Sequence, residues 1–448
     1  MTKDINFSNK QLISLIWPLL LEQIFSLAVG LADSIMVAQV GDAAVSGVSL
    51  VDSISVLMVY IFSAMAAGGA AVCGMYIGKV EKKDANSACQ HLILLMLVLS
   101  VVITGLLYAF RIPIVHLLFG KIDADVMSAT NTYYTIVMAS IPAVALYNGG
   151  AAAFRSMEKT GTTLIVSSIM NVINIVGNAV LIFGFGCGVE GVAIPTLVSR
   201  WVAAFLIIGL LFRKKYSLNL TGIRNFRYRK MILKNIVSIS LPGGIENGMF
   251  QLGKIVLFSF ISTMGTASIT ANAIGSTLAV FNVMPGVAVN LAMTTVVSQC
   301  IGAGEYDKAR YYYKKLVIWT YILIAIWVTI DIVTLPYILA VYHVSPEATD
   351  LAYKVQMLHA ISTAVIWVPS FMTPNFLKST GDATFTMIIS MLSMWIGRVG
   401  GAYLLGGYFG LGVIGVWIAH TIIDWIIRSV SFNIRYFRGT WMKKGLKY

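Results

Sequence analysis

Charged residues are scarce in this chain: Asp, Glu, Lys and Arg make up 11% of 448 residues, whereas hydrophobic residues make up 58%. The mean hydropathy is +0.82. So little charge excludes a soluble globular protein of this length, because its surface would need far more polar residues. The sequence therefore predicts an all-α polytopic membrane protein.

Cysteines and catalytic motifs are also few. Four cysteines, Cys73, Cys89, Cys187 and Cys300, are scattered along the chain and form neither a disulfide framework nor a metal-ligand spacing. The sequence has no Gly-rich phosphate loop, no HExxH and no catalytic Cys–His arrangement. We therefore expect neither an enzyme nor an ATP-driven pump, and no cofactor.

Long apolar runs fill the chain instead. Backbone polar groups in lipid must be satisfied within a segment, so each run is predicted to be a helix. We expect twelve transmembrane helices, at 11–39, 46–77, 88–110, 127–153, 162–186, 190–212, 236–261, 269–299, 314–340, 352–376, 384–406 and 411–434.

The basic residues predict the orientation of these helices. Of the 32 Lys and Arg, 26 fall at the termini or in alternate connections, above all in 213–234, and few fall in the opposite loops. By the positive-inside rule both termini are cytoplasmic. The net charge of +13 is then an orientation signal and a contact with anionic lipids, not a sign of nucleic-acid binding. We expect a multi-pass protein of the plasma membrane that acts as a monomer.

The second half of the chain also repeats the first, at an offset equal to half the chain length. Pro18 then falls on Pro242, Glu22 on Glu246, and the segment GVEGVA (188–193) on GVIGVW (412–417). One constant offset over separated segments indicates two homologous halves, as in many transporters. We expect a first lobe at 1–212, a linker at 213–235, a second lobe at 236–434 and a tail at 435–448. The linker is either a plain solvated segment or a short amphipathic helix on the cytoplasmic face.

Several segments occur in a specific order and spacing. They are WPLLLEQ and LADSIMVAQVG in the first span, IGKVEKKDA and IGAGEYDKA, FRSMEKTGT and LKSTGDAT, NIVGNAVLIFG (174–184), GVEGVAIPT (188–196) and MWIGRVGGAYLL (394–405). Together they resemble the multidrug and toxic compound extrusion family, MATE, over nearly the whole length. The resemblance implies two pseudo-symmetric six-helix lobes forming a V-shaped cleft. It also implies export of organic, drug-like compounds driven by inward flow of protons or Na⁺.

The resemblance further implies a coupling site made of Asp33, Asn174, Asn178 and Thr196. An Asp within an apolar span costs about 2.5–3.5 kcal/mol on insertion scales, so Asp33 should face protein, water or a cation. Asn174 and Asn178 are four residues apart and share one helix face. These oxygens suit Na⁺; alternatively Asp33 carries a proton, or the two Asn only hydrogen-bond neighbouring helices.

Departures from the family pattern leave the coupling ion open between proton and Na⁺. The proton-coupled prokaryotic branch often has Asp at the position of Asn178, and the branch known for Na⁺ coupling has an acid in its tenth helix, where this chain has ISTAVIWVPSFMTPNF. The candidates for a substrate cleft are Glu22, Ser26, Glu246 and Lys254. We expect Lys254 to pair with Glu246, because a buried ammonium needs a partner, and Asp424 to pair with Arg428, four residues on.

The repeat also predicts that the cation site lies only in the first half. At the same offset Asp33 falls on Leu257, Asn174 on Arg398, and Thr196 on His420.

Two alternative functions remain for the protein: a flippase for a lipid-linked glycan, from the same superfamily, and a membrane channel or receptor. Duplicated halves, acids within spans and short loops favour a transporter that works by alternating access.

The orientation can be tested with a cysteine introduced at Asn225. We expect this cysteine to be protected from a membrane-impermeant thiol reagent in intact cells, because the basic 213–234 connection is predicted to be cytoplasmic. Ready labelling at this position would overturn the topology.

Overall fold

The computed structural model describes residues 5–119, 123–444 and 446, and within these ranges it contains helices and no strand. The chain divides into two compact units, one from Asn6 to Gly244 and the other from Ile245 onward. The sequence predicts the connection at 213–235. The division instead falls inside α9 (Lys230–Ser262), whose first part packs with the first unit.

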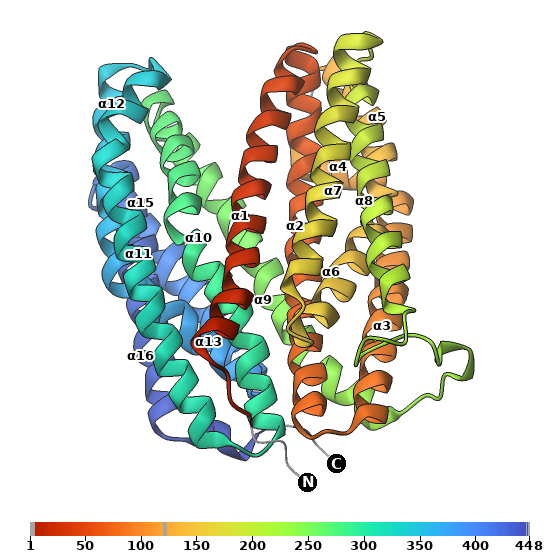
Figure 1. Ribbon diagram of the computed structural model, residues 1–448. Coiled ribbons are helices and arrows are strands. Elements are labelled where there is room, and N and C mark those ends of the chain that lie inside the picture. Colours follow the sequence, from red (N-terminus) through yellow and green to blue (C-terminus); the bar gives the residue numbers. More distant parts are fainter. Residues whose placement is uncertain (1–4, 120–122, 445, 447–448) are drawn as a thin grey trace. The chain divides into compact units, whose positions relative to one another are not determined.

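The first unit is a bundle in which α7 and α8 run side by side and α1 packs on α7 (Figure 1). α1 begins at a capping box, in which Ser8 Oγ accepts from Gln11 N at 3.2 Å and Ser8 N donates to Gln11 Oε1 at 2.8 Å. The helices of the first unit before α9 are α1 (Asn9–Ala38), α2 (Asp42–Gly78), α3 (Lys82–Ala109), α4 (Arg111–Phe119), α5 (Ala124–Met138), α6 (Ile141–Ser156), α7 (Thr160–Ala179), the π-helical turn η1 (Val180–Gly184) and α8 (Glu190–Leu211).

The second unit repeats this plan with more π-helical segments. After α9 come α10 (Thr266–Gly302), α11 (Tyr306–Tyr342), α12 (Pro346–Ser362), η3 (Thr363–Trp367), α13 (Val368–Ser379), α14 (Ala383–Leu392), η4 (Ser393–Gly400), η5 (Tyr403–Tyr408), α15 (Gly412–Ile418), η6 (Ala419–Ile423) and α16 (Asp424–Phe437). Short 3₁₀ turns lie at η2 (Ile223–Asn225) and η7 (Thr440–Lys443).

The repeat offset is visible in the helix boundaries. α2 and α10 are both 37 residues long, and their first and last residues are separated by half the chain length. Each starts after a glycine with positive φ, Gly41 at 124° and Gly265 at 92°. Other residues rarely adopt this backbone conformation. The same turn is therefore built twice, which agrees with the two homologous halves.

Most of the twelve expected spans correspond to long apolar helices. Among the described residues ten helices are long and apolar enough to cross a membrane, and the pair α5–α6, bent by 41°, makes eleven. The remaining expected span, 236–261, lies in α9, which is 33 residues long. α9 is less apolar because it carries Glu246, Asn247, Gln251 and Lys254. The protein is thus a multi-pass membrane protein.

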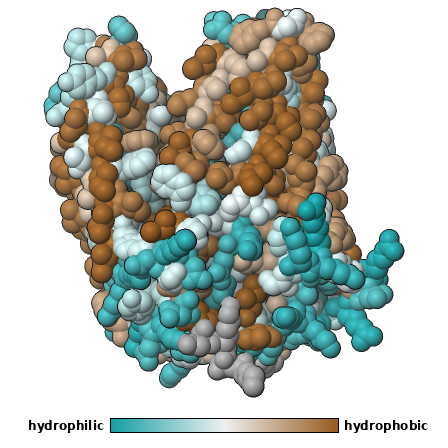
Figure 2. Space-filling view, in the orientation of Figure 1, coloured by the Kyte–Doolittle hydropathy of each residue, from teal (hydrophilic) through white to brown (hydrophobic). Residues whose placement is uncertain are grey.

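The connection between α8 and α9 is neither a plain solvated linker nor an amphipathic helix. Leu218 and Leu220 are buried, and Asn219 N donates to Asn86 Oδ1 at 2.8 Å. Arg229 forms an ion pair with Asp84 and donates its backbone N–H to His91 Nε2 at 3.0 Å. The segment is thereby fastened to α3. Figure 2 shows hydrophilic residues collected around it and hydrophobic residues along the flanks of the first unit's helices.

Small residues let α9 approach α2 closely. A Cβ added to Gly68 of α2 would lie 2.7 Å from the Ser240 backbone, and one added to Gly244 of α9 would lie 2.8 Å from Met65 Cγ. The Gly68 contact is with backbone, which cannot rotate away. The crossing of α2 and α9 therefore depends on the absence of a side chain at Gly68.

We expect Gly68→Ala to lower the thermal unfolding midpoint of the purified protein. Overpacking a buried contact costs about 1–3 kcal/mol, more than the 0.5–1 kcal/mol or so that Ala gains over Gly within a helix. Gly105→Ala in α3 is the matched control, because an added Cβ there meets nothing within 4 Å. Equal midpoints for the two variants would show that the α2–α9 contact is not close.

Candidate functional site around Asp33

Three helices of the first unit bring the four predicted coupling residues together. Asn178 of α7 donates its Nδ2 to Asp33 Oδ1 of α1 at 2.8 Å. The orientation of the Asn174 amide that satisfies its neighbours places its nitrogen 3.0 and 3.1 Å from the two oxygens of Asp33. In that orientation Asn174 Oδ1 accepts from Thr196 Oγ1 of α8 at 3.1 Å. The four residues therefore lie close together, as the sequence predicts.

Close packing of α7 on α8 sets this geometry. A Cβ added to Gly177 would lie 2.7 Å from Pro195 Cβ, so only glycine permits this approach. Gly177 precedes Asn178 and Pro195 precedes Thr196, which means that the contact fixes both polar residues. Two residues after Asn178 the helix widens into η1, and such π-helical turns are frequent at functional sites.

A partly enclosed cavity of about 190 Å³ lies beside this cluster. It is lined by Gly30, Asp33, Ser34 and Val37 of α1, Val45, Val48, Ser49 and Asp52 of α2, Tyr133 of α5 and Val192 of α8. Two carboxylates, those of Asp33 and Asp52, therefore line one space. Asp33 is partly exposed, whereas Asn174 and Asn178 are buried, so the carboxylate is the member of the cluster that solvent can reach.

The second carboxylate has its own partners. Tyr133 Oη donates to Asp52 Oδ1 at 3.0 Å. Arg200 of α8 donates to Ser55 Oγ at 3.1 Å and to Ser140 Oγ at 2.8 Å. In the sequence Asp52 and Arg200 stand out only as charged residues within apolar spans, and Tyr133 does not stand out at all. The sequence therefore does not predict that these residues lie near Asp33. Their assembly depends on the tertiary packing of α2, α5 and α8.

The side-chain amides of Asn174 and Asn178 can present either their N–H groups or their oxygens to Asp33, depending on which way each amide is turned. Both amide nitrogens face Asp33 here, and the buried Asn178 Oδ1 has no hydrogen-bond partner. A carboxylate held by two N–H groups is well stabilised in a dry site. Binding Na⁺ through the amide oxygens would require the amides to turn over, whereas binding a proton on Asp33 would not.

Glu22 lies elsewhere in the first unit, among hydroxyl groups. It is 8% exposed, and Tyr147 Oη and Thr163 Oγ1 donate to its two oxygens, each at 3.3 Å. Glu22 thus joins α1 to α6 and α7. Ser26, one turn later, is exposed.

A sequence model of the family described as MatE matches residues 18–180 and matches again at residues 242–404. The two matches together cover more than half of the chain, and the second is displaced from the first by the same offset as the internal repeat. The chain belongs to the MatE family. The expected family and the duplicated halves are thereby confirmed, and the general class of the protein is a membrane transporter.

Curated relatives of this MatE protein are similar over nearly their whole length. An uncharacterized transporter of Bacillus subtilis, YisQ, is 26% identical over 441 residues, covering 97% of this chain and 95% of its own. A probable multidrug resistance protein NorM of Thermotoga maritima is 24% identical, covering 98% and 94%. A protein of Shewanella oneidensis described as an FAD transporter is 21% identical, covering 77% and 74%.

A solved structure has the same fold. It is a transporter of the MOP superfamily from Pyrococcus furiosus, with a TM-score of 0.89 at 21% identity, covering 97% of this chain and 96% of that one. A likeness at this identity shows the architecture alone.

In the second MatE repeat the expected ion pairs are replaced by others. Glu246 Oε2 lies 2.7 Å from Lys378 Nζ, and Glu246 Oε1 lies 3.8 Å from Arg428. Lys254 is exposed on α9, with Nζ 5.3 Å from the Phe250 ring centroid. The sequence favoured Lys254 as the partner of Glu246 because both are in α9, but two turns of one helix separate them. Lys378 reaches Glu246 from α13.

Asp424 likewise pairs with Arg398 and not with Arg428. Arg398 donates through Nε at 2.9 Å and Nη2 at 2.5 Å to Asp424 Oδ2, and Ser393 Oγ donates to Oδ1 at 2.6 Å. Both members of the pair are buried. Arg398, which the repeat offset places at the position of Asn174, is therefore neutralised by the carboxylate of Asp424.

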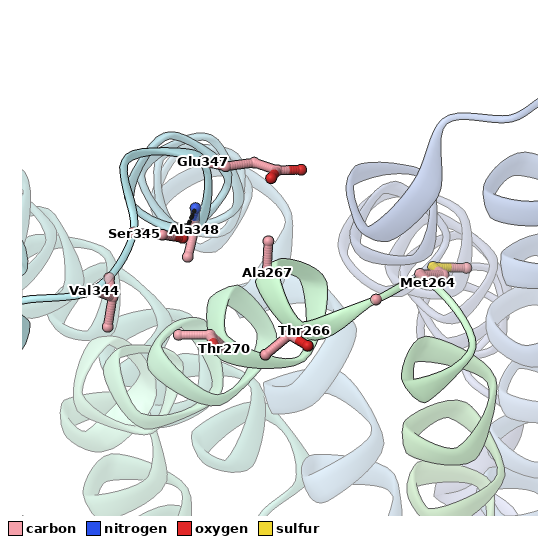
Figure 3. Close-up of a pocket in the computed structure, with 9 residues that line it drawn as sticks. Met264, Thr266, Ala267, Thr270, Val344, Ser345, Glu347 and Ala348 are labelled. Atoms are coloured by element: carbon pink, nitrogen blue, oxygen red, sulfur yellow. Dashed lines mark hydrogen bonds between the residues drawn. The ribbon is translucent and has the colours of Figure 1, made fainter.

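Among the described residues of the second unit, two hollows are candidate binding sites. One, of about 210 Å³, is lined by Glu246, Asn247, Phe250, Asn290, Phe371, Pro374, Asn375, Lys378 and Arg428. The other, of about 600 Å³, lies where α10 and α12 begin. Figure 3 shows Thr266, Ala267 and Thr270 on one side of it and Ser345, Glu347 and Ala348 on the other. Only the first brings acidic and basic side chains together, so it is the better candidate for a binding site.

A double-mutant cycle tests the Glu246 contacts. We expect Glu246→Gln to destabilise the protein, because breaking a buried ion pair on one side costs about 3–5 kcal/mol; partial exposure of Lys378 reduces this cost. Adding Lys378→Met should restore part of the thermal unfolding midpoint. The same cycle with Lys254→Met should show weaker coupling, and stronger coupling to Lys254 would contradict the observed pairing.

Proposed function

We propose that this MatE protein is a secondary active antiporter. It exports organic, cationic or amphipathic drug-like compounds in exchange for protons or Na⁺, by alternating access. The observation that carries the proposal is the Asp33 carboxylate, held by the two amides of α7 at the edge of a cavity. A charge at this depth is costly in lipid, and such residues mark ion pathways.

The chemistry of Asp33 supports a role in coupling. Its carboxylate is the one group of the cluster that can gain or lose a proton, and also its one anionic ligand for a metal cation. Either event removes a negative charge to which Asn174 and Asn178 donate, so it weakens the attachment of α1 to α7. A change in ion occupancy is thereby linked to the packing of three helices, which alternating access requires.

The proposal for the substrate rests on the relatives. Several are described as probable multidrug resistance proteins, and one is described as an FAD transporter. Candidates for contact with the substrate are Glu22, Ser26, Glu246 and Lys254, from α1 and α9. We place the protein in the plasma membrane as a monomer with both termini cytoplasmic, in contact with anionic lipids, and without a cofactor other than the coupling ion or a nucleic-acid partner.

Asp33→Asn tests the proposed coupling. We expect this variant, reconstituted in proteoliposomes, to lose gradient-driven efflux of a cationic dye while retaining the fold, because it removes the charge at little change in size. Separate proton and Na⁺ gradients applied to the wild type identify the ion. Asp42→Asn, an exposed acid at the start of α2, should retain wild-type efflux. Efflux at wild-type rates in Asp33→Asn would exclude Asp33 as the coupling residue.

A further inference from the structure

A second polar cluster is buried inside the second unit. It consists of Asn282 of α10, Asp331 of α11 and Gln356 of α12, each with 0% of its surface exposed. These three helices pack on one another. Asp331 lies within the apolar α11, which is long enough to span a membrane. A carboxyl group in such surroundings needs a specific compensating interaction.

Two hydrogen bonds of this cluster converge on one oxygen. Asn282 Nδ2 donates to Asp331 Oδ2 at 3.1 Å, and Gln356 Nε2 donates to the same atom at 2.7 Å. These contacts fix the orientation of both amides. Three buried oxygens are left without a hydrogen-bond partner: Asp331 Oδ1, Asn282 Oδ1 and Gln356 Oε1. The first belongs to the Asp331 carboxyl itself, and the other two belong to the amides that donate to it.

The surrounding groups do not supply the missing charge. Within the part of the chain that the structure describes, Asp331 has no ion-pair partner, and the guanidinium of Arg398 is bound to Asp424. His359 presents Nδ1 to the Asn282 amide at 3.5 Å and to Thr363 Oγ1 at 3.4 Å. An Nδ1 that faces an amide N–H is an acceptor, so the ring is neutral. Its faces and edges contact Trp417, Trp425 and His420.

A single proton cannot satisfy the three oxygens. A proton on Asp331 Oδ1 converts that atom into a donor to one further oxygen, which leaves the third without a partner. A metal cation, unlike a proton, can take several oxygen atoms as ligands. One carboxylate with two amide oxygens is a hard-oxygen set, suited to an alkali cation and unsuited to transition metals, and its single negative charge matches a single positive one.

We propose that Asn282, Asp331 and Gln356 form a Na⁺ site in the second half. The site is not the repeat mate of the Asp33 cluster, because its residues correspond to Met58, Leu107 and Thr132 in the first half. A site here departs from the expectation, drawn from the repeat, that a cation site lies only in the first half. The proposal is independent of the function proposed for Asp33.

Binding of ²²Na⁺ to the purified protein tests this site. The measurement uses the Asp33→Asn background, so that the cluster of Asp33, Asn174, Asn178 and Thr196 contributes no carboxylate, with choline chloride keeping the ionic strength constant. We expect saturable ²²Na⁺ binding in this background, its loss in Asp33→Asn/Asp331→Asn, and at least a tenfold weaker affinity when Gln356→Met removes one ligand. Asp350→Asn, on the exposed side of α12, is the matched control and should bind as the background does.

Absence of saturable ²²Na⁺ binding in the Asp33→Asn protein would overturn the proposal without any variant of the site. Unchanged binding in a folded Asp33→Asn/Asp331→Asn protein, checked by circular dichroism and size-exclusion chromatography, would also overturn it. If that variant does not fold, Gln356→Met decides, because it retains the carboxyl: unchanged affinity contradicts the site. Loss of dye efflux in Asp33→Asn alone bears on the proposed antiport and not on this site.

Discussion

The constraint on which this structure depends is the cost of placing a charge inside helices that lie in lipid. The buried charges of Glu246, Arg398 and Asp424 are compensated by neighbouring side chains, and these contacts fasten particular helices together. Arg398 and Asp424 join η4 to α16 by two hydrogen bonds. Glu246 joins α9 to α13 and α16. The cost of breaking one such contact exceeds that of most apolar substitutions, so these pairs determine which helices move together.

The duplicated halves show how one backbone plan carries different chemistry. Glu22 and Glu246 occupy equivalent positions, but Glu22 accepts from the hydroxyls of Tyr147 and Thr163, whereas Glu246 is paired with Lys378 and Arg428. Backbone constraints were retained, as at Gly41 and Gly265, because every helix position depends on them. Polar partners diverged, since a partner can come from any neighbouring helix. Symmetry of sequence is therefore a guide to fold and a poor guide to electrostatic environment.

The same distinction explains what could be predicted from the sequence. The helices and the repeat follow from apolar run length and a constant offset, which are local or periodic properties. The Asp33 cluster was predictable because Asn174 and Asn178 lie on one helix face, and because the family resemblance pointed to Asp33 and Thr196 on two other helices. The Glu246 and Asp424 pairs were assigned wrongly because sequence proximity within one helix was taken for spatial proximity, while Lys378 and Arg398 approach from other helices. Nothing in the sequence near Asp331 indicates that Asn282 and Gln356 donate to it.

Helix irregularity accompanies the buried polar groups in both halves. η1 begins two residues after Asn178, η3 follows the turn that carries His359, η4 contains Arg398, and η6 ends where Asp424 begins α16. A π-helical turn carries one extra residue, and the backbone there is held by weaker hydrogen bonds than in a regular helix. Side-chain contacts next to such turns therefore contribute more to holding the local geometry. In the proposed antiport, an ion that binds at Asp33 would therefore act next to η1, where the backbone departs from a regular α-helix.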